Sequence, residues 1–234
     1  MALLSALIAQ LTSLQTAGRL CVGFSGGADS HSLLHALVEL SRREALPPII
    51  ALHVNHGLHE DANTWAAHCA VVASDLGVEI HERFVSVESG ASPEKQARDA
   101  RYTVFESFLD AGDVLLLGHH LDDQVETVLF RLIRGAGPSG LAGIPEQRPL
   151  GKGLLMRPLL KITRAQIEDY VVSHELVYLN DSSNEDTRYD RNFLRHEVLP
   201  LIESRWPGYR HGFVRSAALS GELAASEPID SQTE

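Results

Sequence analysis

The sequence predicts an α/β fold built on an open, mostly parallel β-sheet with helices on both faces. Apolar runs of strand length alternate with longer stretches of helical periodicity through the first half of the chain. Two of these runs, PPIIALHV and DVLLLG, are almost continuously apolar, as parallel strands are when both of their faces are buried. The chain has 234 residues, of which 44% are hydrophobic, so it can bury a core and intrinsic disorder is excluded.

The expected elements of the first half follow one another as strand and helix units. An N-terminal helix would place the leucines from Leu3 to Leu14 along one stripe. Right-handed crossovers would then connect neighbouring parallel strands through helices. Strands are expected at residues 20–24, 49–54, 78–84 and 114–117, and helices at residues 30–43, 61–76, 93–110 and 122–134.

The second half of the chain changes character and predicts a helical C-terminal extension. Residues 135–153 are rich in Gly and Pro, which indicates a long irregular loop. A helix is expected at residues 164–174, and an amphipathic helix begins near Arg191. We expect one domain over residues 1–215, followed by an acidic and frayed tail over residues 216–234.

Composition excludes several classes of protein. No stretch approaches the roughly 18 uninterrupted apolar residues of a membrane helix, so a soluble protein is expected. The N-terminus has no basic residue before Arg19, so a secretory signal fits poorly. Cys21 and Cys69 lie inside apolar runs without C-x-x-C spacing, which argues against a disulfide framework, a zinc site or a dithiol redox centre. A reducing cytoplasm is the simplest setting.

The net charge of −11 is unevenly distributed along the chain. Residues 1–130 carry 7 basic and 17 acidic groups, whereas residues 131–215 carry 13 basic and 10 acidic groups. Such asymmetry favours a polyanionic partner on the less acidic segment. The alternative for the asymmetry is ordinary surface variation. The alternative for the arginines near residue 191 is that they only order the loop by pairing with Asp181, Glu185, Asp186 and Asp190.

A glycine-rich segment, Ser25-Gly26-Gly27-Ala28-Asp29-Ser30, joins the first expected strand to a helix. Ligands of open parallel sheets bind where strands end, and the free amides of a helix N-terminus favour phosphate. Adjacent glycines let the backbone approach a ligand closely, while the serine hydroxyls add donors and Asp29 could hold Mg²⁺ beside phosphates. The alternative is a simple turn with a helix N-cap. The segment is not a Walker A loop, because the Gly-Lys-Ser/Thr ending is missing.

A second polar segment, GHHLDDQVET, follows the fourth expected strand. If it opens a helix, His119, Asp123 and Glu126 share one face at positions i, i+4 and i+7. An imidazole and two carboxylates would then converge near the carboxyl end of the sheet. The alternative is a solvated helix start, where Asp122 and Asp123 only complement the helix dipole.

Further candidates lie on the third expected helix and after the second expected strand. Arg98 and Arg101 could clamp triphosphate oxygens, because guanidinium groups match phosphate geometry, although an ion pair of Glu94 with Arg98 is an alternative. His53 and His56 have the spacing of metal ligands but lack a third ligand nearby, so a polar lining of a nucleotide pocket fits better.

Taken in order, these segments resemble the bacterial tRNA(Ile)-lysidine synthetase family, a branch of the PP-loop ATP pyrophosphatase superfamily. The resemblance runs from about residue 20 to residue 207. It implies a Rossmann-like sheet of the PP-loop type. The matching segments are SGGADS (25–30), HVNHGL (53–58), LGHHLDDQVET (117–127), RLIRGAG (131–137), RPLL (157–160), DSSN (181–184) and RNFLR (191–195).

The resemblance implies an ATP-dependent ligase whose substrates are free lysine and an isoleucine tRNA with a CAU anticodon. The wobble cytidine would be adenylated with Mg²⁺ at the loop, pyrophosphate would leave, and the lysine ε-amine would then displace AMP. His119 or a carboxylate would act as the general base. The expected residues are Asp29, His119 and Asp123 for catalysis; Ser25, Gly26, Gly27, Asp29, Ser30, His53, Arg98 and Arg101 for ATP; Asp29 for Mg²⁺; Asp123 and Glu126 for lysine; and Arg131, Arg134, Arg191 and Arg195 for tRNA.

Two departures from the family pattern and two other functions remain open. Lys95 stands at a small-residue position, and His59 stands where the family commonly has arginine. A PP-loop tRNA thiolase would be expected to use C-x-x-C cysteines or an iron–sulfur cluster, and a non-catalytic ATP-binding module would need neither. Many members of the family also carry further C-terminal domains, and none is visible in this sequence. The oligomeric state is not predicted.

Overall fold

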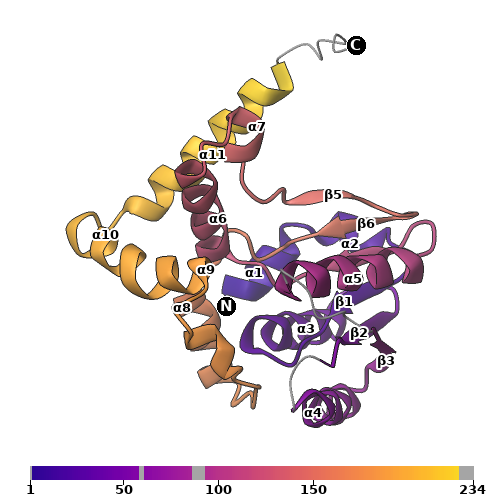
Figure 1. Cartoon of the computed structure of the whole chain (residues 1–234). Helices are drawn as coiled ribbons and strands as arrows, with labels where there is room; N and C mark the ends of the chain where they lie inside the picture. Colours follow the sequence, from indigo (N-terminus) through magenta and orange to yellow (C-terminus); the bar gives the residue numbers. More distant parts are fainter. Residues whose placement is uncertain (1, 58–60, 86–92, 227–234) are drawn as a thin grey trace, which may run out of the picture. The chain divides into compact units, whose positions relative to one another are not determined.

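The computed structural model describes residues 2–57, 61–85 and 93–226 (Figure 1). The chain divides into two compact units, which we describe one at a time. The first unit comprises the residues up to His120 together with Glu146–Asn180. The second comprises Leu121–Pro145 together with the residues from Asp181 onward.

A six-stranded sheet forms the centre of the first unit, with the strand order β3-β2-β1-β4-β6-β5. All neighbouring pairs are parallel except the pair of β5 and β6, which confirms the predicted open parallel sheet. The strand order reverses between β1 and β4, and ligands of such sheets bind at this switch point. The strands are β1 (Leu20–Gly23), β2 (Ile49–Asn55), β3 (Glu79–Phe84), β4 (Val114–Leu116), β5 (Gln147–Leu150) and β6 (Gly153–Met156).

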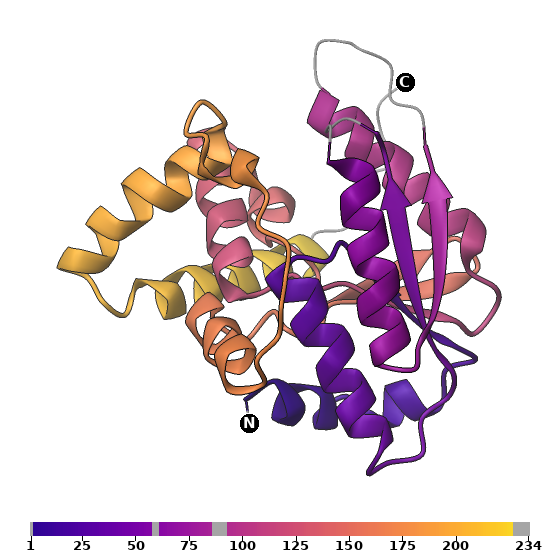
Figure 2. The same ribbon diagram turned by 90° about the horizontal axis from the view of Figure 1, so that it is seen from below.

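Helices cover both faces of this sheet, because alternate residues of each strand point to opposite sides. Leu20 and Val22 of β1 belong to one core with helices α1, α3, α4 and α8, whereas Cys21 belongs to a second core with Phe105 of α5. Figure 2 shows α3 and α4 on the near side of the strands. The helices of this unit are α1 (Ala2–Ile8), α2 (Leu11–Gln15), α3 (Ala28–Ser41), α4 (Ala62–Asp75), α5 (Pro93–Phe108) and α8 (Arg164–Ser173).

A hairpin replaces part of the loop expected over residues 135–153. Strands β5 and β6 pair antiparallel around a two-residue turn at Gly151 and Lys152, and Gly151 has φ +56°. A Cβ at Gly151 would lie 2.9 Å from the backbone oxygen of Glu106, so the turn needs glycine for its space as well as its conformation. The prediction of a continuous loop was therefore wrong for this segment. The N-terminal helix also differs from expectation, because it breaks into α1 and α2.

The second unit is helical and has its own core, which Val125, Leu129, Leu194, Leu199 and Tyr209 form. Its elements are α6 (Leu121–Ile133), α7 (Pro138–Leu141), a 3-10 turn (Ser182–Glu185), α9 (Asp190–Phe193), a π-helical turn (Leu194–Val198), α10 (Leu199–Arg205) and α11 (Tyr209–Ser226). The helical C-terminal part is thus confirmed.

Part of the segment expected to be a frayed tail is helical. Helix α11 continues through Ser226 because Ala217 is buried and the helix packs against α6 and α7. Residues 227–234 lie outside the described residues. None of the described helices has the length and hydropathy needed to cross a membrane.

Candidate functional site

The glycine-rich segment forms a closed loop between β1 and α3. Gly26 has φ +81°, a conformation that side-chain-bearing residues rarely adopt, and Gly27 caps α3 with extended backbone. The Ser25 and Ser30 hydroxyls lie 3.1 Å apart, and Ser30 Oγ donates a hydrogen bond to the Gly27 carbonyl at 3.1 Å. The two predicted phosphate donors therefore also hold the loop in shape.

The loop is fastened to the rest of the first unit from two sides. His53 is buried at the carboxyl end of β2, and its Nδ1 lies 2.9 Å from the carbonyl oxygen of Phe24. Because a carbonyl only accepts, this contact makes Nδ1 the donor and directs Nε2 elsewhere. Leu179 donates its backbone N–H to the Gly26 carbonyl at 2.9 Å, and its side chain packs where a Cβ on Gly26 would lie.

Asp29, in the first turn of α3, faces a histidine that the sequence did not single out. His120 Nε2 lies 3.8 Å from Asp29 Oδ2, and the His120 side chain is buried while Asp29 is about one-third exposed. Gly118 permits this approach, because a Cβ there would lie 3.0 Å from the backbone carbon and oxygen of Asp29. His119, the predicted base, is only partly buried. The sequence analysis chose His119 from helical spacing, but α6 begins at Leu121, so neither histidine lies on the helix.

Arg98 and Arg101 lie on α5, the helix on which the sequence predicted them. Arg98 is exposed and lies over the ring of Tyr102, with its guanidinium carbon 5.0 Å from the ring centroid. Arg101 is partly buried, and its Nε has no hydrogen-bond partner within the described part of the chain. Burial lowers the pKa of Arg101, and the charge of Arg98 lowers it further. The side chain of Glu94 and all of His59 lie outside the described residues.

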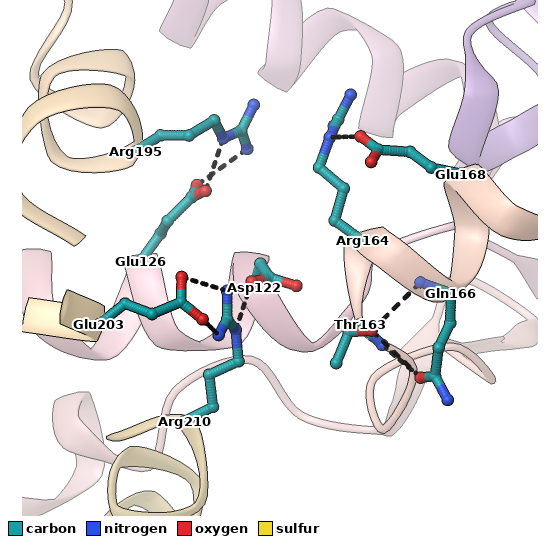
Figure 3. Close-up of polar contacts among 9 residues, drawn as sticks. All are labelled: Asp122, Glu126, Thr163, Arg164, Gln166, Glu168, Arg195, Glu203 and Arg210. Carbon is teal, nitrogen blue, oxygen red and sulfur yellow. Dashed lines mark hydrogen bonds and ion pairs between the residues drawn. The ribbon is translucent and has the colours of Figure 1, made fainter. Parts of the chain in front are cut away.

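The second unit brings together three residues that the sequence assigned to two different roles. Arg195 Nε lies 2.6 Å from Glu126 Oε1, and its Nη2 lies 3.0 Å from Glu126 Oε2 (Figure 3). The Nη2 atom also lies 3.4 Å from Asp123 Oδ1. The Glu126 side chain is only 2% exposed. Arg195 stands in the π-helical turn, a deviation that often marks functional sites. The predicted lysine carboxylates thus contact one of the predicted tRNA arginines.

A second guanidinium holds the neighbouring carboxylate of α6. Arg210 of α11 donates to Asp122 at 2.7 Å and also pairs with Glu203 of α10 (Figure 3). Hydrogen bonding to Glu203 raises the pKa of Arg210 above its usual value, with a smaller contribution from Asp122. Asp122 is therefore part of a network of ion pairs joining α6, α10 and α11. The sequence analysis missed Arg210 because Asp122, its partner on α6, is 88 residues away along the chain.

The other predicted tRNA arginines differ in their surroundings. Arg131 donates to the carbonyls of Gly140 and Gly143 at 2.8 and 2.9 Å, which holds the segment around α7. Arg134 is exposed and pairs with Asp190 at 3.2 Å, and Arg191 is exposed. Arg188, a neighbour in the sequence, pairs with Asp186.

The described residues favour neither a resident metal ion nor a reactive thiol. No group of three His, Cys, Asp or Glu side chains within the described ranges has the geometry of a metal site. One carboxylate such as Asp29 suits Mg²⁺ that is also bound by phosphate oxygens. Burial raises the pKa of Cys21 to about 11 and that of Cys69 to about 12, so neither forms a thiolate readily.

Comparison with known proteins assigns the chain to a family that is named for this type of loop. A family model described as a PP-loop domain matches residues 3–202. The chain is 50% identical over 228 residues to a tRNA(Ile)-lysidine synthase of Pseudomonas aeruginosa, covering 94% of this chain and 52% of that protein. It is 45% identical over 203 residues to the tRNA(Ile)-lysidine synthase of Legionella pneumophila, covering 85% and 46%. The chain spans about half the length of these curated relatives.

Solved structures resemble the chain in fold alone. A U34-tRNA thiolase of Methanococcus maripaludis superposes with a TM-score of 0.78 at 18% identity, covering 99% of this chain and 82% of the thiolase. An NMN synthetase of Francisella tularensis superposes with a TM-score of 0.51 at 11% identity, covering 97% and 96%. At these identities the chemistry of the neighbours does not transfer to this chain.

Proposed function

This chain belongs to the PP-loop domain family, and on that premise we propose that it is an ATP-dependent ligase that forms lysidine in an isoleucine tRNA. The observation that carries the proposal is the 50% identity to a tRNA(Ile)-lysidine synthase over 94% of this chain. That similarity extends across both the glycine-rich loop and the carboxylates of α6. We further propose the cytoplasm as its setting, where its tRNA substrate is found.

The first half of the reaction would take place at the loop of the first unit. The O2 atom of the wobble cytidine attacks the α-phosphorus of ATP, and the bond to the β-phosphate oxygen breaks to release pyrophosphate. The loop amides and the α3 N-terminus would hold the phosphates, with Asp29 as the ligand of Mg²⁺. The ion would neutralise phosphate charge. His120, 3.8 Å from Asp29, would orient that carboxylate.

The second half of the reaction would use the carboxylates of the second unit. Arg195 pairs with Asp123 and Glu126, and Arg210 pairs with Asp122 and Glu203. The carboxylates of Asp123 and Glu126 would suit a ligand that carries ammonium groups, and they would disfavour an anionic amino acid. We assign Arg195 to this site as a positioning residue, because it fixes Glu126 through a bidentate pair.

Carbon–nitrogen bond formation requires a neutral amine. The lysine ε-amine attacks C2 of the adenylated cytidine, the bond from C2 to the activated oxygen breaks, and AMP leaves with that oxygen. The amine must lose protons in the process, and His119, between the end of β4 and α6, is the proposed base. Arg134 and Arg191, which are both exposed, would contact tRNA phosphates.

The alternatives make different predictions about the chemistry of this chain. A thiolase would need an accessible sulfur carrier, whereas Cys21 and Cys69 are buried with raised pKa values. An ATP-binding module without catalysis would release no AMP. The test is an omission series that measures AMP and pyrophosphate from labelled ATP while tRNA or lysine is left out. We expect pyrophosphate to require tRNA and AMP to require both tRNA and lysine. Release of AMP at the same rate with and without lysine would contradict the proposal.

A further inference from the structure

A short segment of the first unit that follows α8, residues 177–179, holds the glycine-rich loop at Gly26; we call this segment the strap. Leu179 donates its backbone N–H to the Gly26 carbonyl at 2.9 Å, and its side chain is half-buried. A Cβ on Gly26 would lie 2.7 Å from Leu179 Cδ1 and 2.9 Å from Cys69 Sγ of α4. Side chains of the strap and of α4 therefore enclose Gly26, which has φ +81°.

The strap is itself anchored to α3. The ring of His31, which directly follows the loop, is hydrogen-bonded to the backbone of Val177. His31 is 5% exposed, and its ring meets the ring of Phe24 edge-on with the centroids 6.0 Å apart. Phe24 directly precedes the loop. One end of the strap is therefore bonded to the loop at Leu179, and the other end is bonded to the helix that the loop begins.

The hydrogen bond from Leu179 sets the direction of one amide of the loop. The Gly26 carbonyl and the Gly27 N–H belong to one trans peptide group, so they point in opposite directions. Because the carbonyl points toward Leu179, the Gly27 N–H points away from the strap, and it donates to Ser25 Oγ at 3.4 Å. This contact is long for a hydrogen bond, so a phosphate oxygen would be a stronger acceptor for the same N–H.

We propose that Leu179 is a positioning residue for the phosphates of ATP. Its side chain and its N–H hold Gly26 in the left-handed conformation, which directs the Gly27 N–H toward the bound phosphate. The inference rests on the proposed function, in which this loop binds ATP, and deepens it by naming what orders the loop. Glycine populates many backbone conformations, so two adjacent glycines alone leave a loop free to move. A loop that is already held in its binding conformation loses less entropy when ATP binds.

Binding of ATP and of adenosine to the whole chain tests this role, measured by isothermal titration with Mg²⁺ and without tRNA or lysine. Leu179→Ala should weaken ATP binding about tenfold, the worth of one hydrogen bond to a charged group, because the space left by the side chain lets Gly26 change conformation. Adenosine has no phosphate, so its affinity should change less than twofold. Leu179→Met keeps the volume and should bind ATP as wild type does. Leu179→Val should fall between the two, and it provides the test if the alanine variant does not fold.

The matched control is Leu176→Ala, the same truncation three residues earlier. Leu176 packs against the core that α1, α3, α4 and α8 share. We expect this variant to unfold at a lower urea concentration than wild type and to bind ATP with unchanged affinity. Hydrogen exchange of the amides of residues 25–30, measured without ATP, should be faster in Leu179→Ala than in Leu176→Ala.

The outcomes separate this inference from the proposed function. Equal ATP affinity of Leu179→Ala and Leu176→Ala would overturn the inference, as would equal exchange of the loop amides in the two variants. An equal loss of ATP and adenosine binding would indicate general damage to the site and would also count against it. If ATP binding and exchange behave as expected but no lysine is joined to tRNA, the role of Leu179 stands and the proposed function fails. If lysine is joined to tRNA while Leu179→Ala binds ATP as wild type does, the proposed function stands and the inference fails.

Discussion

Replacing Arg195 with alanine removes the guanidinium that faces the buried carboxylate of Glu126. The Glu126 side chain is 2% exposed and the Arg195 side chain 26% exposed, so the pair is largely shielded from water. Removing one partner of a buried pair costs about 3–5 kcal/mol, and the partial exposure of Arg195 puts this case at about 3 kcal/mol. For a chain of this length that corresponds to a fall in Tm of roughly 6–12 °C.

The pH dependence of the stability of the Arg195→Ala variant would identify the Glu126 carboxylate as the cause of the lost stability. Without the guanidinium, burial should raise the pKa of Glu126 above its value in the unfolded chain. The folded variant then binds the proton more tightly than the unfolded chain does, so its stability relative to wild type rises as pH falls toward about 4.3. Urea unfolding at pH 7.5 and pH 4.5 would measure this difference. The double variant Arg195→Ala/Glu126→Gln should recover much of the lost stability at pH 7.5.

The matched control is Arg188→Ala, since Arg188 also pairs with an aspartate but is exposed. We expect its unfolding curve to coincide with that of wild type. An Arg195→Ala variant as stable as the Arg188→Ala control, or one whose deficit does not change with pH, would refute the role of Arg195 as the partner of a buried charge.

The remaining predictions concern the separate steps of the proposed reaction and one buried histidine. Asp29→Asn should abolish pyrophosphate release while leaving the unfolding curve unchanged, and release at the wild-type rate would exclude Asp29 as the Mg²⁺ ligand. Asp123→Asn should raise the KM for lysine roughly ten- to a hundredfold, because one charge-assisted bond is worth about 1.5–3 kcal/mol. The KM for ATP should change little. Equal effects on the two KM values would point to a structural role. Arg191→Ala should reduce the slope of tRNA affinity against salt concentration by about one unit, and an unchanged slope would exclude a phosphate contact. Burial lowers the pKa of His31 to about 4, so the folded chain binds this proton less readily than the unfolded chain, and stability should fall as pH drops from about 6.5 toward 4. His31→Phe should flatten that fall in urea unfolding, and an unchanged pH profile would show that other groups cause it.

The sheet and the loop could be predicted because their signals are local. Continuous apolar runs predicted the parallel strands, and the paired glycines predicted a loop between β1 and α3. The hairpin of β5 and β6 was missed because each strand is only four residues long and Pro149 weakens the pattern of an edge strand.

The polar contacts of the second unit could not be read from local pattern. Arg195 and Glu126 are 69 residues apart, and helical spacing near Arg195 indicated only which residues share a face. Whether that face meets water or a carboxylate depends on how α6 and the π-helical turn pack. The same limitation hid Arg210, which is 88 residues from Asp122. The preference for His119 over His120 rested on a helix that would include residue 119, whereas α6 begins at Leu121.

The most direct test of the account is the identity of the modified nucleoside. The chain would be incubated with ATP, Mg²⁺, labelled lysine and an unmodified isoleucine tRNA transcript with a CAU anticodon, and the digested product analysed by mass spectrometry. The account predicts one lysine attached to the wobble cytidine for each AMP released. It also predicts no product on a transcript whose wobble base is changed to guanine. AMP released without lysine on the cytidine, or lysine attached to both transcripts, would contradict the account.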